Sequence, residues 1–191
     1  MCLKKILSGI GALTILSVVV LLIAFGNRIS QVNKLDSKAI GLYMQMFDKV
    51  LETGDAAKAM VIKRKMIIPE GMTKEEAIEN AIEIMDDVGS EYGLALVDHK
   101  VMSRAPYIEI RSYCSPTIGK RFIAFSPEFI GFMPCRLGFA EDVNGDIYIY
   151  TMSLDLMING GYPLTDEMLK LANEVREGMY SMMEKAASGD S

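Results

Sequence analysis

The feature that most constrains this chain is a run of twenty uncharged residues, 6–25, directly after Lys4 and Lys5. Thirteen of the twenty are Leu, Ile, Val or Phe, and a helix of that length spans roughly 30 Å, the thickness of the hydrocarbon core of a bilayer. The run therefore predicts a transmembrane helix. Residues 1–28 would form an N-terminal anchor that contacts the lipid bilayer through residues 6–25.

The alternative interpretation of this segment is a cleaved signal peptide, because Ala24-Phe25-Gly26 has the small-x-small pattern of a cleavage site. The apolar part of a signal peptide is normally about 7–15 residues long, so the length of the run favours a retained anchor. Both interpretations leave the short basic N-terminus in the cytoplasm. We therefore predict a single-pass protein of the cytoplasmic (inner) membrane with its folded domain outside, which is the periplasm in a bacterium.

The charge of the remaining chain excludes one class of function. From residue 26 onward there are 25 acidic against 18 basic residues, a net charge of −7. Such a surface repels nucleic acid, so no DNA- or RNA-binding function is expected. The roughly 165 residues after the anchor have the length of one domain.

Hydrophobic periodicity predicts an α+β fold for this domain. An apolar stripe over residues 36–52 predicts a helix, and a capping box at Thr73 and Glu76 predicts the start of another. Asn144-Gly145 predicts a hairpin turn between two strands. A mostly antiparallel sheet with helices on one face accounts for this order. The expected strands are residues 59–68, 94–101, 107–113, 135–141 and 147–152, and the other expected helices are residues 117–125, 127–132 and 165–187.

The order of several short motifs carries a family resemblance. The segment Tyr-Ile-Glu-Ile-Arg-Ser-Tyr-Cys-Ser-Pro at 107–116 precedes Phe-Ser-Pro-Glu at 125–128, Phe-Met-Pro-Cys-Arg-Leu at 132–137 and Glu-Asp-Val-Asn-Gly-Asp-Ile-Tyr-Ile at 141–149. This order resembles the family called domain of unknown function 302, over residues 58–152. The resemblance implies a compact α+β domain like the repeat of the TATA-binding protein, often dimeric through its sheet. It implies no catalytic residue, because the family has no settled activity.

The chain is therefore expected to have four parts. Residues 1–28 form the anchor, residues 29–57 a linker and helix, residues 58–155 the α+β domain, and residues 156–191 a C-terminal amphipathic helix and tail. The two helices that flank the α+β domain are similar to additions in a membrane-anchored branch of the family.

Cys114 and Cys135 are the strongest candidates for chemistry, because they flank the predicted short helix at the ends of two strands. In an oxidising compartment such a pair favours a disulfide that closes a loop of about twenty residues. Two alternatives stay open. The thiols are buried and unpaired, or they form a reactive pair for thiol exchange or sulfur handling in which Arg136 lowers a thiol pKa. Under the last alternative, all three residues are weak catalytic candidates.

The fifteen methionines are unusual for a chain that has no tryptophan. Several lie on one face of the last predicted helix, a spacing that favours a core face or an adaptable binding surface over a Cu(I) site. The candidates for binding a partner are Met168, Met179, Met182 and Met183.

No metal or cofactor is predicted. His99 is the only histidine, which excludes a His-based zinc site. Asp98 and His99 are expected to be exposed strand residues rather than an acid–base pair, and Glu109 is expected to face solvent. Residues 142–146 imitate the start of a calcium loop but lack its end, so a hairpin turn is the better interpretation.

We therefore expect a non-enzymatic accessory protein on the outer side of the cytoplasmic membrane that binds a small ligand or a membrane protein complex. The alternative function is thiol-based redox chemistry or sulfur handling by Cys114 and Cys135. The two functions differ in the thiol pKa that they require, because a strongly depressed pKa at either cysteine would favour the thiol-based function.

Overall fold

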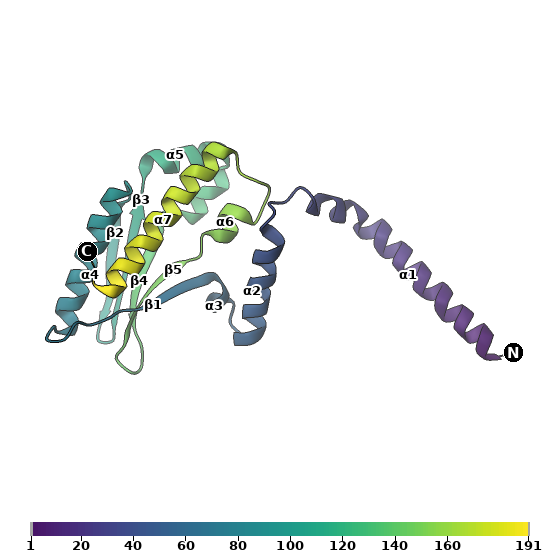
Figure 1. The fold of residues 1–191 in the computed structure, drawn as a ribbon, viewed down its shortest axis with the longest axis horizontal. Helices are drawn as coiled ribbons and strands as arrows, with labels where there is room; N and C mark the ends of the chain where they lie inside the picture. The colour runs from purple at the N-terminus through teal and green to yellow at the C-terminus, as the bar shows by residue number, and fades with distance from the viewer. Residues whose placement is uncertain (1, 191) are drawn as a thin grey trace.

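The computed structural model describes residues 2–190, without the side chains of residues 2–10, 12, 13, 27 and 29. Its centre is a five-stranded antiparallel sheet in the order β1-β5-β4-β3-β2 (Figure 1). This α+β architecture with an antiparallel sheet is the fold predicted for the domain. The strands are β1 (Val61–Lys65), β2 (Ala95–Arg104), β3 (Tyr107–Cys114), β4 (Cys135–Glu141) and β5 (Ile147–Met152).

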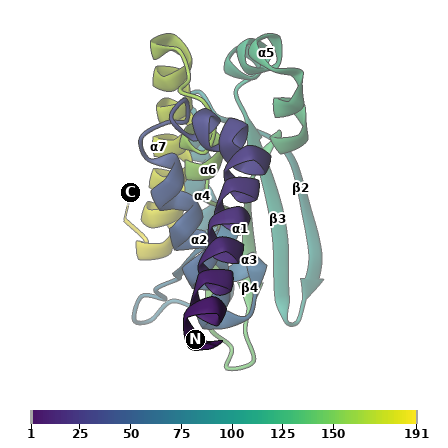
Figure 2. The same ribbon diagram turned by 90° about the vertical axis from the view of Figure 1, so that its right-hand side faces the viewer.

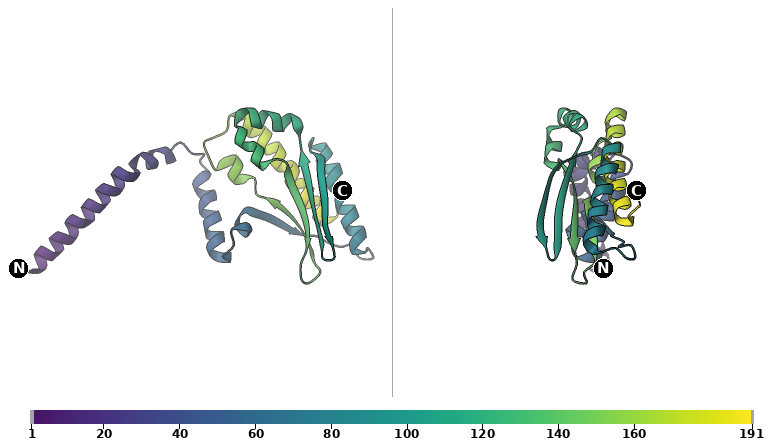
Figure 3. Two further views of the ribbon diagram at one scale, coloured as in Figure 1. Left: turned by 180° about the vertical axis from the view of Figure 1, so that it is seen from behind. Right: turned by 90° about the vertical axis from the view of Figure 1, so that its left-hand side faces the viewer.

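Two long helices, α4 (Lys74–Glu91) and α7 (Asp166–Ser188), cover one face of the sheet (Figure 3, right). α4 packs on β2, whereas α7 packs on β1, β4 and β5 and also on α4. The remaining helices are α1 (Cys2–Val32), α2 (Ala39–Thr53), α3 (Ala56–Met60), α5 (Pro116–Phe125), the 3-10 helix η1 (Pro127–Phe132) and α6 (Asp155–Asn159). α5 lies at the end of the sheet where β3 ends (Figure 2).

The capping box at the start of α4 is confirmed. The Glu76 N–H donates to the Thr73 hydroxyl at 3.2 Å, and the Thr73 N–H donates to the Glu76 carboxylate at 2.8 Å. Each of these N–H groups lies before the first full helical turn and has no partner within the helix, so the two bonds fix where α4 begins.

The hydrophobic core fills the space between the sheet and the two helices. Strand alternation directs Leu137 and Phe139 of β4, and Ile147 and Ile149 of β5, toward the helices, where each is at most 1% exposed. Removing each such side chain from water contributes about 1.5–3 kcal/mol. The helices contribute Ala81, Met85, Met179, Met182 and Met183 to the same core, all at most 1% exposed.

The predicted membrane span over residues 6–25 is corrected by the structure. Within the described part of the chain, no helix is long and apolar enough to cross a membrane. These residues belong to α1, in which Thr14 and Ser17 interrupt the apolar side chains and which continues through Arg28. The side chains of residues 6–10, 12 and 13 lie outside the description. The single-pass topology, the membrane-anchored family branch and the placement at the inner membrane with an external domain are therefore not supported.

The predicted strand over residues 59–68 is shorter in the structure. The Asp55 carboxylate accepts the Ala57 N–H at 2.8 Å, which starts the one-turn helix α3 where extended chain was expected. β1 then begins at Val61, which pairs with Met152 of β5. The cap therefore sets the start of the strand.

The close approach of α7 to the α4–β2 connection generates a prediction. An ideal Cβ atom on Gly178 would lie 2.8 Å from both Tyr92 Cβ and Leu94 Cδ1. We expect Gly178→Ala to lower the free energy of unfolding by about 1–3 kcal/mol, because the overlap outweighs the helix preference of alanine, about 1 kcal/mol. Gly41→Ala in α2 is the matched control. Its Cβ would meet nothing within 4 Å, so urea denaturation should show no loss of stability. Equal stability of the two variants would contradict the close packing.

Candidate functional site

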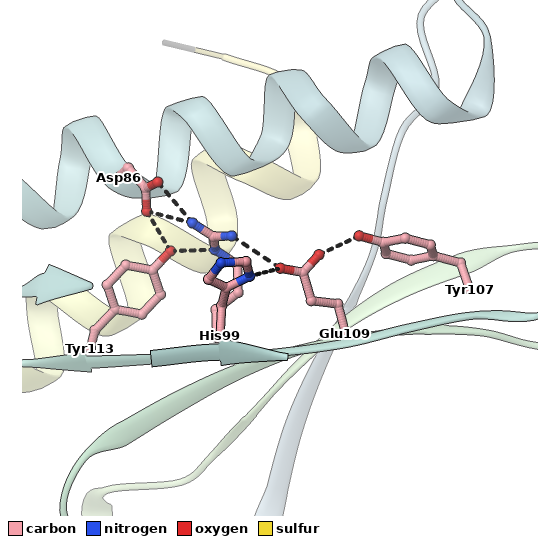
Figure 4. Close-up of polar contacts among 6 residues, drawn as sticks. Asp86, His99, Tyr107, Glu109 and Tyr113 are labelled. Carbon is pink, nitrogen blue, oxygen red and sulfur yellow. Dashed lines mark hydrogen bonds and ion pairs between the residues drawn. The ribbon is translucent and has the colours of Figure 1, made fainter. Parts of the chain in front are cut away.

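Polar side chains line the face of β3 that α4 covers (Figure 4). Tyr107, Glu109, Arg111 and Tyr113 occupy every second position of the strand, and alternation places all four on this face. Asp86 reaches them from α4. We call these five residues the β3 network. Glu109, Arg111 and Tyr113 are buried, Tyr107 is partly buried, and the Asp86 side chain is 41% exposed.

Arg111 is the hub of the β3 network. Its guanidinium donates to both carboxylate oxygens of Asp86, at 3.1 and 2.8 Å, and to Glu109 Oε1 at 3.0 Å. Its Nε donates to the Tyr113 hydroxyl at 2.9 Å, and that hydroxyl donates to Asp86 Oδ1 at 2.7 Å. The Tyr107 hydroxyl donates to the Glu109 carboxylate. The network therefore satisfies a fully buried charge pair with hydrogen bonds on every side, as such a pair requires.

Burial sets the protonation state of this network. Glu109 is 2% exposed and Arg111 is 5% exposed. Burial raises the pKa of the Tyr107 phenol and of the Tyr113 phenol, and the hydrogen bonds to Glu109 and Asp86 act in the same direction. Burial by itself would lower the pKa of Arg111, but its bonds to Tyr113, Glu109 and Asp86 raise it above its ordinary value. Both phenols are therefore neutral donors at neutral pH, and Arg111 is a cation.

His99 is at the solvent edge of the network. It pairs with Arg111 in the β2–β3 ladder, its side chain is 57% exposed, and its Nδ1 lies 3.5 Å from Glu109 Oε1. The prediction that Asp98 and His99 are exposed is confirmed. The prediction that Glu109 faces solvent is wrong, because α4 covers its side of β3. The alternation of four polar residues in β3 was the sequence pattern that could have indicated a polar network on one face of the strand.

The β3 network has a structural consequence for its neighbour. Tyr113 is fully buried, and its ring also lines a cavity of about 50 Å³ at the end of the sheet. Since the Tyr113 hydroxyl is fixed by Arg111 and Asp86, the network holds this wall of the cavity in place.

The cavity lies between the ends of β3 and β4, the helices α5 and η1, and the helices α6 and α7. Apolar side chains form most of its lining, which includes the sulfur-containing residues Cys114, Met133, Cys135 and Met157. Gly119 of α5 leaves room for two of them, because a Cβ atom there would lie 3.3 Å from Met133 Sδ and 3.8 Å from Cys114 Sγ.

The predicted disulfide between Cys114 and Cys135 is wrong, because both thiols are free. Cys135 pairs with Tyr113 across the β3–β4 ladder, so these two side chains leave the sheet on the same face. Cys114 follows Tyr113 and therefore starts on the opposite face. Both cysteines are partly buried, so of the three alternatives the geometry matches the unpaired thiols.

Neither thiol is activated for nucleophilic chemistry. Burial raises the pKa of Cys135 to about 11, with a further contribution from Cys114 that outweighs the opposing charge of Arg136. Burial also raises the pKa of Cys114. Arg136 itself is exposed. At neutral pH both sulfurs are thiols, which are poor nucleophiles.

The four methionines proposed to bind a partner lie in the core. Met179 and Met182 are fully buried, Met183 is 1% exposed and Met168 is 6% exposed, all on the inner side of α7. In this structure they fill the space between α7, α4 and the sheet and present no surface to another molecule.

A different set of methionines lines an open groove of about 490 Å³. Met46 comes from α2, Met60 from α3, Met152 from β5 and Met157 from α6. We call this hollow the methionine groove. Met157 and Phe132 line both the groove and the sulfur-lined cavity, so the two hollows are neighbours. No sequence pattern indicates this set, because its members are far apart along the chain and share no periodicity.

The loop between β4 and β5 is a hairpin turn, as predicted. Asp142 Oδ1 accepts the N–H groups of Asn144 at 2.9 Å and of Asp146 at 3.0 Å, and Gly145 has φ +82°. Within the described residues, no three or more His, Cys, Asp or Glu side chains are grouped so that they could hold a metal ion.

The buried charge pair generates a prediction. Arg111→Met leaves Glu109 buried without its partner, so we expect the free energy of unfolding to fall by about 3–5 kcal/mol. The double variant Arg111→Met, Glu109→Leu removes both charges and should regain most of that loss. Arg136→Met, at an exposed position of the next strand, is the control. A loss for Arg111→Met no larger than that for the control, read by urea denaturation, would contradict the role of the hub.

The raised pKa of the Cys135 thiol generates a second prediction for this site. With a pKa of about 11 instead of the ordinary 9.0, Cys135 has about a hundredfold less thiolate at pH 8 than in the unfolded chain. We expect iodoacetamide to alkylate Cys135 at least that much more slowly in the folded protein, with a rate that rises about tenfold per pH unit up to about pH 11. Mass spectrometry of timed samples gives the rates. A rate that levels off near neutral pH would show an activated thiol.

The comparisons with known proteins agree with one another. No curated protein matches the chain. A solved structure, "Crystal structure of uncharacterized conserved protein DUF302 from Bacillus stearothermophilus", is similar in fold, with a TM-score of 0.50 and 13% sequence identity over 66% of this chain and 98% of that chain. The sequence model of the family "Domain of unknown function DUF302" matches residues 69–186, more than half of the chain. The chain therefore belongs to the DUF302 family.

Proposed function

We propose that this protein is a non-catalytic binding protein that holds a small ligand in the methionine groove. The observation that carries the proposal is the groove itself, which is open and lined by four partly exposed methionines from four separate elements. Its volume of about 490 Å³ lies in the range of small-molecule sites. Methionine side chains are flexible and polarisable, which suits adaptable binding surfaces.

The polar side chains of the groove support binding rather than catalysis. Asp155 accepts a hydrogen bond from Arg176 at 3.1 Å, and Lys49 donates to Glu52 at 2.8 Å, so both groups are held in ion pairs. Ser153 Oγ lies 3.2 Å from the Asp155 carboxylate, with no histidine beside it. These contacts fix the rim but supply no nucleophile with an adjacent base.

The thiol-based function is less well supported. It requires a low thiol pKa, whereas burial raises the pKa of both Cys114 and Cys135. It also requires access for a partner sulfur, and the cavity that the two thiols line has a volume of only about 50 Å³.

Methyl NMR of the full chain with ¹³C-methyl-labelled methionine tests the proposal. A mixture of indole, cyclohexanol and benzamide serves as the probe. We expect it to shift the methyl signals of Met46, Met60, Met152 and Met157. The signals of Met44 and Met102, which are 54% and 60% exposed but outside the groove, should stay in place.

A pair of variants on one helix provides the control. Met46→Lys places a charge in the groove and should raise the dissociation constant of the probes at least about tenfold, the equivalent of 1.4 kcal/mol. Met44→Lys lies outside the groove on the same helix and should change nothing. Circular dichroism checks that both variants fold. Shifts of equal size at Met44 and at the groove methionines would contradict the proposal, as would equal binding by the two variants.

A further inference from the structure

Two groups of methionines among the described residues differ in their environment. Six of them, including Met85, Met179 and Met182, are buried and fill the core. The four of the methionine groove are instead partly accessible, and Met60 is 44% exposed. Core packing does not explain why these four methionines line a surface hollow. Single exposed apolar side chains need no explanation, but a group of them around one hollow indicates a binding site.

Backbone contacts bring the four residues to one place although they span more than a hundred positions. The Ser153 N–H donates to the Met60 carbonyl at 2.8 Å, and Val61 pairs with Met152, so Met60, directly before β1, lies beside the end of β5. Met157 follows on α6, and α2 packs against α6 with Met46 facing the same groove. The convergence therefore depends on tertiary contacts that the β1–β5 pairing fixes.

Thioether sulfur has a specific chemical preference. It is a soft, neutral ligand that selects Cu(I) and the chemically similar Ag(I), whereas Mg²⁺, Ca²⁺ and Zn²⁺ prefer oxygen, nitrogen or thiolate. It carries no proton to displace, so it binds such an ion without the deprotonation that Cys114 and Cys135 would need. Of the remaining lining, Leu42, Phe132 and Leu156 are apolar. Gln45, Ser153 and Asp155 carry oxygen atoms, and the Asp155 carboxylate is already bound by Arg176.

Charges at the rim do not oppose a monovalent cation strongly. Lys49 is paired with Glu52, and the carboxylate of Asp155 is shared with Arg176. Lys58 is exposed at the rim, where solvent screens its charge.

We infer that the methionine groove binds a soft monovalent metal ion, Cu(I) or Ag(I), through the sulfur atoms of Met46, Met60, Met152 and Met157. The inference rests on the proposed function and names the class of its ligand. A neutral site of this kind binds the ion reversibly and is suited to holding or transferring it rather than to catalysis.

Silver nitrate is the probe for the test, because Ag(I) does not change its oxidation state in air. The labelled full chain is titrated with Ag(I) and, separately, with Zn(II) in a chloride-free buffer. We expect Ag(I) added beyond the amount that the cysteine thiols take up to shift the methyl signals of the four groove methionines together, with Met44 and Met102 unchanged. Zn(II) should shift none of them.

The variant Met46→Leu, Met60→Leu, Met152→Leu, Met157→Leu separates ligation from packing, because leucine keeps the volume of methionine but removes the sulfur. It should lose groove binding of Ag(I), read as one bound ion fewer in native mass spectrometry. The control Met44→Leu, Met102→Leu should keep it. The cysteines are the same in both proteins and cancel in the comparison.

The outcomes distinguish the inference from the proposed function. If the organic probes shift the groove methyls but Ag(I) does not, the metal inference is overturned and the binding function stands. Retention of the ion by the fourfold leucine variant would also overturn the inference. If neither Ag(I) nor the organic probes shift the groove methyls, both fail. Loss of the ion in that variant alone, with the circular dichroism spectrum unchanged, supports the metal site.

Discussion

The buried guanidinium of Arg111 is the interaction on which the arrangement of the domain depends. It joins Asp86 of α4 to Glu109 and Tyr113 of β3, and thereby fixes how the helix lies on the sheet. Neither charge of the Arg111–Glu109 pair could stay buried alone, because an unpaired charge in the interior costs several kcal/mol. Burial of each charge therefore depends on the presence of the other.

This unit also connects the core to the hollows at the end of the sheet. Tyr113 belongs to the β3 network through its hydroxyl and to the cavity wall through its ring. Beyond that wall, Phe132 and Met157 separate the cavity from the methionine groove. The hydrogen-bonded network thus adjoins a region lined by cysteine and methionine residues, the latter with unbranched side chains that have several rotatable bonds.

Several expectations from sequence depended on assumptions that tertiary structure overturned. Length and hydropathy alone predicted a membrane span over residues 6–25, whereas no helix in the described part of the chain meets both requirements. Position near strand ends alone predicted a disulfide, whereas Cys114 and Cys135 line the same cavity as free thiols. Glu109 was expected to face solvent from its place in an alternating strand, whereas it is buried with Arg111 and Tyr107 of the same strand as its partners, and Asp86 of α4 binds the other side of Arg111.

The sequence by itself determined the features that local physics controls. The capping box at Thr73, the hairpin at Asn144-Gly145 and the α+β pattern of an antiparallel sheet follow from hydrogen bonds and periodicities within a few residues. Only the tertiary structure decided which methionines are core and which line a groove, and which polar residues of β3 meet α4. Both outcomes depend on contacts between segments far apart in the chain. The pairing of β1 with β5 and the packing of α4 establish these contacts, and no local sequence pattern encodes them.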